Sequence, residues 1–363
     1  MNSGPSKSGN NAPHQHSVID PAFHRNRVRS LTFLAILALA LVVAILLSLR
    51  AGSYETPVSE LIRGIFGAAH DENINRIVLN NRLPRICTAL IAGAGLGISG
   101  CVLQAILRNP LASASTLGVS QGASFGAAFA IIVLNAGTVG AAGTAMIPVC
   151  AFAGSMAVAL VIFGLSRFRQ ISPEGIVLAG VAISSMFTGA TTLIQYFADE
   201  IELASLVFWT FGSLGSTTWS DLRIMGIVVL LTSVVFLLHR WDYNALLSGT
   251  ETAVSLGINV RRLTMVDMIL CCLTASTIVS YIGLINFIGL VAPHIVRMVV
   301  GNNHVYLLPG SILAGSTLLL LGDLFARVAI SPVILPIGAI TSFLGGPLFL
   351  YLLFKGGRRN AER

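Results

Sequence analysis

Charged residues are scarce in this chain. Asp, Glu, Lys and Arg make up 10% of its 363 residues, whereas soluble domains carry about 25%. None of them occurs in the 58 residues from Asn109 to Ser166, and one membrane crossing needs only about 20 apolar residues. Hydrophobic residues account for 55% of the chain. The scarcity of charge excludes a soluble domain and predicts an all-α, polytopic membrane protein.

Several chemical motifs are also missing from the sequence. The five cysteines lie in apolar segments without CxxC or metal-ligand spacing, so we interpret them as small hydrophobic residues and expect no metal site. The chain has no phosphate-binding loop of the type GxxxxGK followed by Ser or Thr, so it is not expected to be an enzyme, and any ATP hydrolysis belongs to another polypeptide. The centres of the apolar segments lack acidic residues, which disfavours a proton- or sodium-driven carrier.

Windows with few or no charged residues predict where the chain crosses the membrane. They are residues 31–49, 86–107, 116–134, 143–166, 175–198, 221–239, 298–322 and 328–354. The segment 268–293 is long enough for one tilted helix or two short crossings. If the basic clusters at Arg261 and at Lys355 both face the cytoplasm, an even number of crossings lies between them. This parity favours a break near Gly283, a short helix near 285–299 and about ten helices in total.

The distribution of basic residues predicts the orientation. With both termini inside, the inner segments carry 15 of the 22 Lys and Arg residues, as the positive-inside rule requires. Both termini are therefore predicted to be cytoplasmic, in a multi-pass protein of the cytoplasmic membrane. Basic residues in short loops need no nucleic acid to explain the net charge of +7. Residues 1–28 are predicted to be a disordered tail, and 29–359 the transmembrane domain.

Arginines gather on the predicted outer side, where they are disfavoured. Arg82 and Arg85 flank the start of the second crossing, and Pro84 suits a first helical turn. Asp323 and Arg327 stand four residues apart and could pair on a helix. The arginines either anchor the helices to lipid headgroups or form an exposed basic dock for an acidic partner.

Two inner features also depart from the apolar background. The loop 241–262 predicts a short helix from Asn244 to Leu256, with Gly257 as its C-terminal cap. That helix either lies on the membrane surface or serves as a handle for a cytoplasmic motor. Asp267 follows Arg262 by five residues, and a local salt bridge between them is favoured over a proton-relay role.

Blocks of sequence in a fixed order carry a family resemblance. They are, in chain order, Arg82-Leu83-Pro84-Arg85, Gly93 to Gly100 with Gln104, Arg108 to Ala112, Leu117 to Ala123, Phe208-Trp209 with Gly212-Ser213-Leu214, Phe287 to Arg297, and Leu335-Pro336-Ile337-Gly338. With these blocks, the chain resembles the FecCD/BtuC-type permeases of bacterial ABC importers for ferric siderophores, haem and cobalamin. The resemblance covers about residues 29–359. One departure is Ile334, where many relatives carry Glu.

The resemblance implies an assembly and its working surfaces. It implies a BtuC-like type II importer fold, a dimer with a second identical or homologous permease, two cytoplasmic ABC ATPases that hold ATP-Mg, and an extracytoplasmic solute-binding protein. The permease itself would bind no cofactor. The implied docking residues for the binding protein are Arg82, Arg85 and Arg327. The implied ATPase-coupling residues are Leu247, Ser248, Gly249, Thr250, Glu251, Ala253, Leu256 and Gly257. The implied path-lining residues are Ser184, Ser185, Thr188, Thr191, Thr192 and Gln195.

The resulting hypothesis is a permease that passes an iron–siderophore complex inward. Haem and cobalamin are the alternative cargoes, because the sequence discriminates poorly among the three. A secondary carrier that needs no ATPase is the alternative from a different class, and loss of uptake on collapse of the proton gradient would identify it.

Overall fold

The computed structural model describes residues 21–51, 57–136, 140–168 and 173–361. Within these ranges the regular elements are helices, apart from one isolated bridge between Ile330 and Val333. The first half of the chain contains α1 (Pro21–Arg50), α2 (Val58–Ile65), α3 (Glu72–Ile77), the π-helical segment η1 (Val78–Arg82), α4 (Leu83–Ile106), α5 (Val119–Ala128), the π-helical segment η2 (Phe129–Val133), α6 (Gly140–Phe168) and α7 (Pro173–Gln195).

The second half of the chain contains short helices between membrane-spanning ones. The elements are α8 (Glu200–Phe211), α9 (Trp219–Leu238), α10 (Arg240–Leu247), α11 (Thr250–Ser255), α12 (Val260–Ile282), α13 (Ile288–Val300), α14 (His304–Val328) and α15 (Ile337–Ala361). Seven helices of the described residues are long and apolar enough to span a membrane, and three shorter apolar helices accompany them. This all-helical architecture confirms the predicted polytopic membrane fold.

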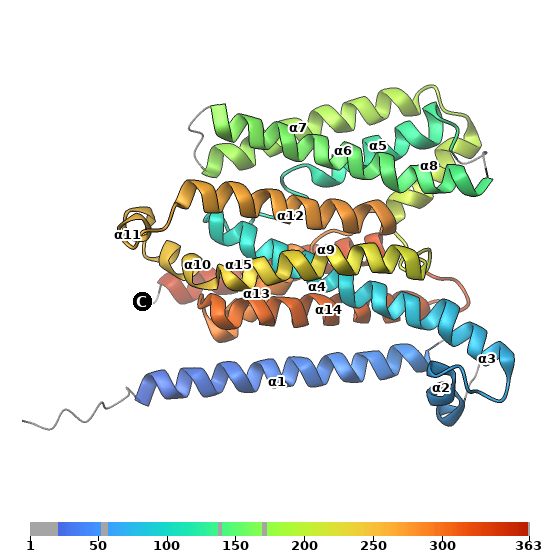
Figure 1. Cartoon of the computed structure of the whole chain (residues 1–363), viewed down its shortest axis with the longest axis horizontal. Helices are drawn as coiled ribbons and strands as arrows, with labels where there is room; N and C mark the ends of the chain where they lie inside the picture. Colours follow the sequence, from blue (N-terminus) through green and yellow to red (C-terminus); the bar gives the residue numbers. More distant parts are fainter. Residues whose placement is uncertain (1–20, 52–56, 137–139, 169–172, 362–363) are drawn as a thin grey trace, which may run out of the picture.

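The long helices lie side by side, and the short helices α2, α3, α10 and α11 lie at the two ends of the bundle (Figure 1). At one end, α2 and α3 follow the end of α1; we call it the α2–α3 end. At the other end, α10 and α11 connect α9 to α12; we call it the α10–α11 end. Helices α5 to α8 form a group along one edge, and α1 runs along the opposite edge.

Helix α4 is the centre of the bundle because its glycines allow backbones to touch. A Cβ atom at Gly93 would lie 2.4 Å from the carbonyl oxygen of Gly315, and one at Gly97 would lie 2.3 Å from that of Ser311. A Cβ at Gly100 would approach the carbonyl oxygen of Gly289 even more closely. Small residues at such positions let membrane helices pack by van der Waals contact. Helix α4 is thereby fixed against α14 and α13.

The predicted break in segment 268–293 is confirmed. Helix α12 ends at Ile282, and the capping residue Gly283 has φ +75°, which a residue with a Cβ adopts only with strain. A Cβ there would lie 2.3 Å from the carbonyl oxygen of Trp209, so space as well as φ requires glycine. The following short helix, α13, corresponds to the helix expected near 285–299.

Several predicted boundaries are wrong. Helix α1 already begins at Pro21, so a disordered tail cannot extend to residue 28; residues 1–20 lie outside the described part of the chain. Helix α14 spans His304–Val328, not 298–322, because Asn303 caps its start. The 244–256 helix is two helices, α10 and α11, since Gly249 with φ +114° interrupts it. Helix α8, which follows the capping residue Asp199, was not expected.

Candidate functional site

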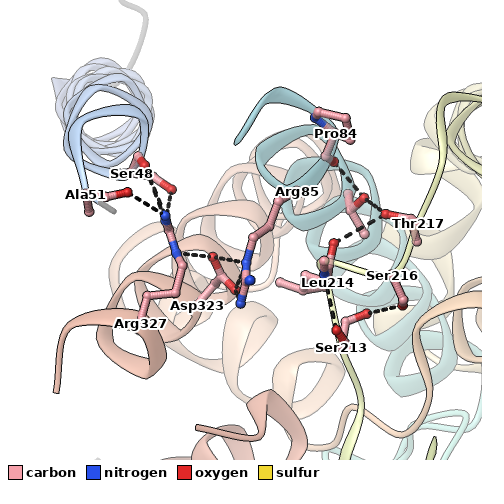
Figure 2. Close-up of polar contacts among 12 residues, drawn as sticks. Ser48, Ala51, Pro84, Arg85, Ser213, Leu214, Ser216, Thr217, Asp323 and Arg327 are labelled. Carbon is pink, nitrogen blue, oxygen red and sulfur yellow. Dashed lines mark hydrogen bonds and ion pairs between the residues drawn. The ribbon is translucent and has the colours of Figure 1, made fainter. Parts of the chain in front are cut away.

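A buried ionic cluster joins three helices at the α2–α3 end (Figure 2). Asp323 on α14 is completely buried and accepts ion pairs from both sides. Arg85 on α4 places its Nη2 2.8 Å from Asp323 Oδ1, and Arg327 places its Nε 3.0 Å from Asp323 Oδ2. The predicted i,i+4 pairing of Asp323 with Arg327 is confirmed, while Arg85 comes from 238 residues earlier in the chain.

The remaining donors of these arginines hold the end of α1. Arg327 Nη1 donates to the carbonyl oxygen of Ala51 at 2.9 Å, and its Nη2 also contacts the Ser48 hydroxyl. Arg82 Nη1 donates to the carbonyl oxygen of Leu49 at 2.8 Å. A buried charge needs a partner because transfer from water is costly, and here the partners come from α1, α4 and α14. The cluster therefore fixes the ends of three helices.

The expectation that these arginines form an exposed basic patch is wrong. Arg82 is 6% exposed, and the side chains of Arg85 and Arg327 are 14% and 10% exposed. The carboxylate of Asp323 neutralises part of their charge. Sequence spacing could not show this burial, because it depends on the end of α1 lying beside Arg82 and Arg327 (Figure 2).

A loop beside Arg85 completes this end of the bundle. The hydroxyls of Thr88 on α4 and Thr217, in the segment between α8 and α9, lie 2.5 Å apart. Thr217 also donates to the carbonyl oxygen of Leu214 at 3.3 Å (Figure 2). The segment between α8 and α9, which contains the Gly212–Leu214 block, is thus bonded to the start of α4 through Thr217.

The predicted path-lining residues form a hydroxyl-rich face on α7. Ser185, Thr188 and Thr192 are exposed within the single chain, and Ser184, Thr191 and Gln195 are half-buried. The five hydroxyls each donate to the carbonyl oxygen four residues earlier, for example Thr188 to Ser184 at 2.8 Å. Each hydroxyl proton is therefore already in use, while oxygen lone pairs still face outward.

An open groove runs along the start of this face. It is lined by Ser115, Thr116, Val181, Ser184, Ser185 and Thr188. The loop before α5 can approach α7 closely because Gly118 adopts φ +89°, and a Cβ there would lie 2.8 Å from the Ser184 hydroxyl oxygen. The Leu117–Ala123 block therefore positions one wall of the groove.

At the α10–α11 end, the predicted coupling residues form a mainly exposed surface. Leu247 and Leu256 are 53% and 67% exposed, and Ser248, Thr250, Glu251 and Gly257 are exposed beside them. The exceptions are Gly249, which is half-buried, and Ala253, which lies on the fully buried side of α11. Gly257 has φ +85° just past the end of α11, which confirms its predicted place at the helix end. Apolar side chains exposed together at the end of a bundle are typical of a partner surface.

The predicted salt bridge between Asp267 and Arg262 is wrong. Five residues on a helix of 3.6 residues per turn place two side chains on nearly opposite faces. Asp267 is instead buried against His239, whose Nδ1 lies 3.1 Å from Oδ1, and Tyr243, whose hydroxyl donates to Oδ2 at 2.7 Å. Neither partner could be predicted, since both come from the α9–α10 corner.

Polar residues near the α10–α11 end also have partners. Arg297 on α13 donates to Gln104 Oε1 on α4 at 2.7 Å. Arg108 contacts the hydroxyl of Thr250 on α11, so the turn after α4 touches the coupling surface. The Asn109 side chain accepts from the backbone N–H of Leu111 at 2.9 Å. These residues fix the Arg108–Ala112 turn beside α11.

Comparison with known proteins places the chain among transport permeases. The model of the FecCD transport family matches residues 40–355. A Methanocaldococcus jannaschii protein named as an ABC transporter permease is 44% identical and covers 91% of this chain and 96% of its own length. The hemin transport permease of Yersinia pestis is 36% identical, with coverage of 91% and 97%. The molybdate import permease of Haemophilus influenzae is 35% identical, with coverage of 88% and 94%.

A solved structure has the same fold. It is an inward-facing metal-chelate-type ABC transporter, 34% identical to this chain, with a TM-score of 0.78 over 89% of this chain and 99% of its own. The likeness extends through the membrane helices and not only through the motif blocks.

Proposed function

The chain belongs to the FecCD transport family, and from this membership we propose that it passes an iron–siderophore complex inward through a dimer of permeases. It is a non-catalytic, multi-pass permease subunit of an ABC importer, a class that works with an ATPase and a binding protein. Permeases of this family bind no cofactor themselves, and the described residues contain no cluster of His, Cys, Asp or Glu that could hold a metal ion. Membership also sets aside the alternative of a secondary carrier.

The hydroxyl face of α7 is the observation that supports the proposed position of the transport path. Only 22% of the residues in the apolar window of this helix are buried within the single chain, against 78% for the window that includes α4. We place this face on the path between two permease copies. Its hydroxyl protons are satisfied internally, so the face offers weak acceptors and no fixed charge. Such a surface suits a bulky, polar complex that must bind and then leave.

The proposed cargo is supported by chemistry and by relatives together. Relatives of similar identity carry the names of hemin and molybdate systems, so identity does not select the cargo. The matching solved transporter is of the metal-chelate type. A neutral hydroxyl face suits a chelate, whose ligand covers the metal charge, better than a small bare oxyanion, which prefers fixed positive charge or N–H donors. Haem is the second candidate because the hemin permease is similar over nearly the whole chain.

The two ends receive different partners. We place the ATPase on the exposed coupling surface of α10 and α11, in the cytoplasm with both termini, and the solute-binding protein on the α2–α3 end. Arg85 and Arg327 pair with Asp323, and Arg82 donates to the carbonyl oxygen of Leu49. These buried arginines bind the partner if its docking opens or extends those contacts. Replacing Arg85 by Gln should then weaken binding of the binding protein to the purified complex. A lower melting temperature with unchanged affinity would assign Arg85 to holding the helices together.

Uptake of radiolabelled iron tests the cargo. A strain that lacks this chain is supplied with iron as ferrichrome, as ferric enterobactin or as hemin, in parallel with the same strain carrying the gene. Loss restricted to a siderophore supports the proposal, and loss restricted to hemin replaces the cargo with haem. Normal uptake of all three contradicts an iron cargo, and cobalamin and molybdate uptake are measured next.

A further inference from the structure

Helix α10 is held by a buried hydrogen bond to a membrane-spanning helix. Tyr243 on α10 is completely buried, and its hydroxyl donates to Asp267 Oδ2 at 2.7 Å. Asp267 lies on α12, is also completely buried, and receives a second contact from His239 Nδ1 at 3.1 and 3.2 Å. A carboxylate hidden from water needs such partners, so the contact is a fixed point between α10 and α12.

The proton of this hydrogen bond stays on the tyrosine. Burial, and then the charge of Asp267, raise the pKa of Tyr243 far above its ordinary value. The hydroxyl is therefore a permanent donor under physiological conditions, and the carboxylate is its acceptor. Hydrogen bonds to charged groups are shorter and stronger than neutral ones.

A second set of contacts holds α10 to α14. The side-chain oxygen of Asn244 accepts from the backbone N–H of His304 at 2.8 Å, and its Nδ2 donates to Asn303 Oδ1 at 3.0 Å. The rings of Tyr243 and His304 are 5.5 Å apart. Adjacent residues of α10 thus connect to two different membrane helices.

Helix α11 is attached differently. Gly249, with φ +114°, separates it from α10, and its residues Thr250, Glu251 and Val254 are exposed. Its polar side-chain contact to the turn after α4 runs from Arg108 to Thr250, at the surface. A surface element can move a membrane helix only through contacts that persist while the element moves. The hydrogen bond between α10 and α12 joins two completely buried side chains, Tyr243 and Asp267, whereas Asn244 and Arg108 are partly or fully exposed.

We propose that the Asp267 carboxylate is the point at which α10 transfers ATPase-driven movement to α12, with Tyr243 and His239 as positioning residues. This inference rests on the proposed coupling role of the α10–α11 surface. It predicts a division of labour: exposed residues of that surface set how well the ATPase binds, whereas the buried contact sets how much transport each ATP supports.

The test measures transport per ATP in the complete complex. The permease is reconstituted with its ATPase and binding protein in liposomes, and uptake of radioiron-labelled ferrichrome or hemin is divided by ATP hydrolysed. Tyr243→Phe removes one hydroxyl and keeps the ring. It should lower the ratio several-fold, with ATPase association and melting temperature retained. Tyr306→Phe is the matched control, because the Tyr306 hydroxyl makes no hydrogen bond to the described residues, and its ratio should equal that of the wild type.

Two results would overturn the inference. One is a wild-type ratio in Tyr243→Phe; the other is an equally lowered ratio in the control Tyr306→Phe, which would show that the effect is not specific to Tyr243. If Tyr243→Phe does not assemble, His239→Gln removes the second partner at a partly exposed position, and a wild-type ratio there overturns the inference as well.

Failure of the proposed cargo remains distinguishable. In that case the wild-type complex takes up neither probe, and stimulation of ATP hydrolysis by the binding protein replaces uptake as the measured response. Unchanged stimulation in Tyr243→Phe then counts against the inference. If the wild-type permease does not bind the ATPase at all, that result would instead refute the proposed coupling surface.

Discussion

Helices α4 and α7 are both apolar membrane helices, yet they have opposite surroundings. In the apolar stretch that includes α4, 78% of the residues are buried, whereas in the apolar stretch of α7 only 22% are buried. Glycines on α4 bring neighbouring backbones into contact, whereas a Cβ at Gly189 on α7 would meet nothing within 4 Å. One chain thus contains a closed core and a helix whose surface is left for a partner, lipid or cargo. The comparison predicts that substitutions in the core affect folding and those on α7 affect transport.

The largest effect on folding is expected at Asp323. Asp323→Asn leaves the guanidinium groups of Arg85 and Arg327 without their counter-charge in a buried site, and breaking a buried pair in this way costs about 3–5 kcal/mol. Chemical unfolding in detergent measures the loss. The control is Glu72→Gln, because the Glu72–Arg76 pair has side chains 78% and 70% exposed and should contribute about 0–1 kcal/mol.

Neutralising all three residues sharpens this prediction. A protein with Asp323→Asn, Arg85→Gln and Arg327→Gln should recover part of the stability lost in Asp323→Asn alone, because the two guanidinium groups are then removed together with their counter-charge. Equal destabilisation by Asp323→Asn and Glu72→Gln would show that the cluster is not part of the closed core.

A smaller loss is expected from Gly93→Ala. The added methyl group would lie 2.4 Å from the carbonyl oxygen of Gly315, so α4 and α14 must separate, and overpacking of this kind costs roughly 1–3 kcal/mol. Gly189→Ala is the matched control on α7, where the same methyl group meets open space. Melting temperatures of the two purified proteins provide the measurement. Equal melting temperatures would mean that α4 and α14 can separate freely.

The parts predictable from sequence are those governed by local chemistry. The break near Gly283 followed from charge parity and a glycine, and the Asp323–Arg327 pair followed from helical spacing. The contacts of Arg85 and Asp267 could not be predicted, since their partners lie 238 and up to 28 residues away on other helices. Burial of the predicted docking arginines also depends on tertiary packing, because α1 supplies the carbonyl groups that cover them.

Gly249 is expected to tolerate substitution with a moderate penalty. Its φ of +114° is strained for any residue with a Cβ, although a Cβ there would contact only the Thr252 hydroxyl, at 3.9 Å. Gly249→Ala should therefore cost about 1–3 kcal/mol locally through backbone strain alone. We expect the global melting temperature to change little and hydrogen exchange of α11 to increase. Unchanged exchange in α11 would show that the break between α10 and α11 is flexible enough to absorb the substitution.

The smallest effect on stability and a large effect on transport are expected on α7. Thr188→Val and Thr192→Val replace exposed hydroxyls by methyl groups of similar size, and their donors serve only the carbonyl groups of their own helix. Surface substitutions of this kind change stability by less than about 0.5 kcal/mol. If the face lines the path, uptake by the reconstituted variant complexes falls several-fold. The reason is that the substitutions remove the hydroxyl oxygen lone pairs that a polar cargo would contact. Thr210→Val is the control on α8: Thr210 is half-buried and its hydroxyl also bonds to its own helix, so it separates the effect of a path residue from that of removing any such hydroxyl. Equal uptake by all three variants would assign the open face of α7 to lipid, and the contrast with α4 would then concern only burial and not function.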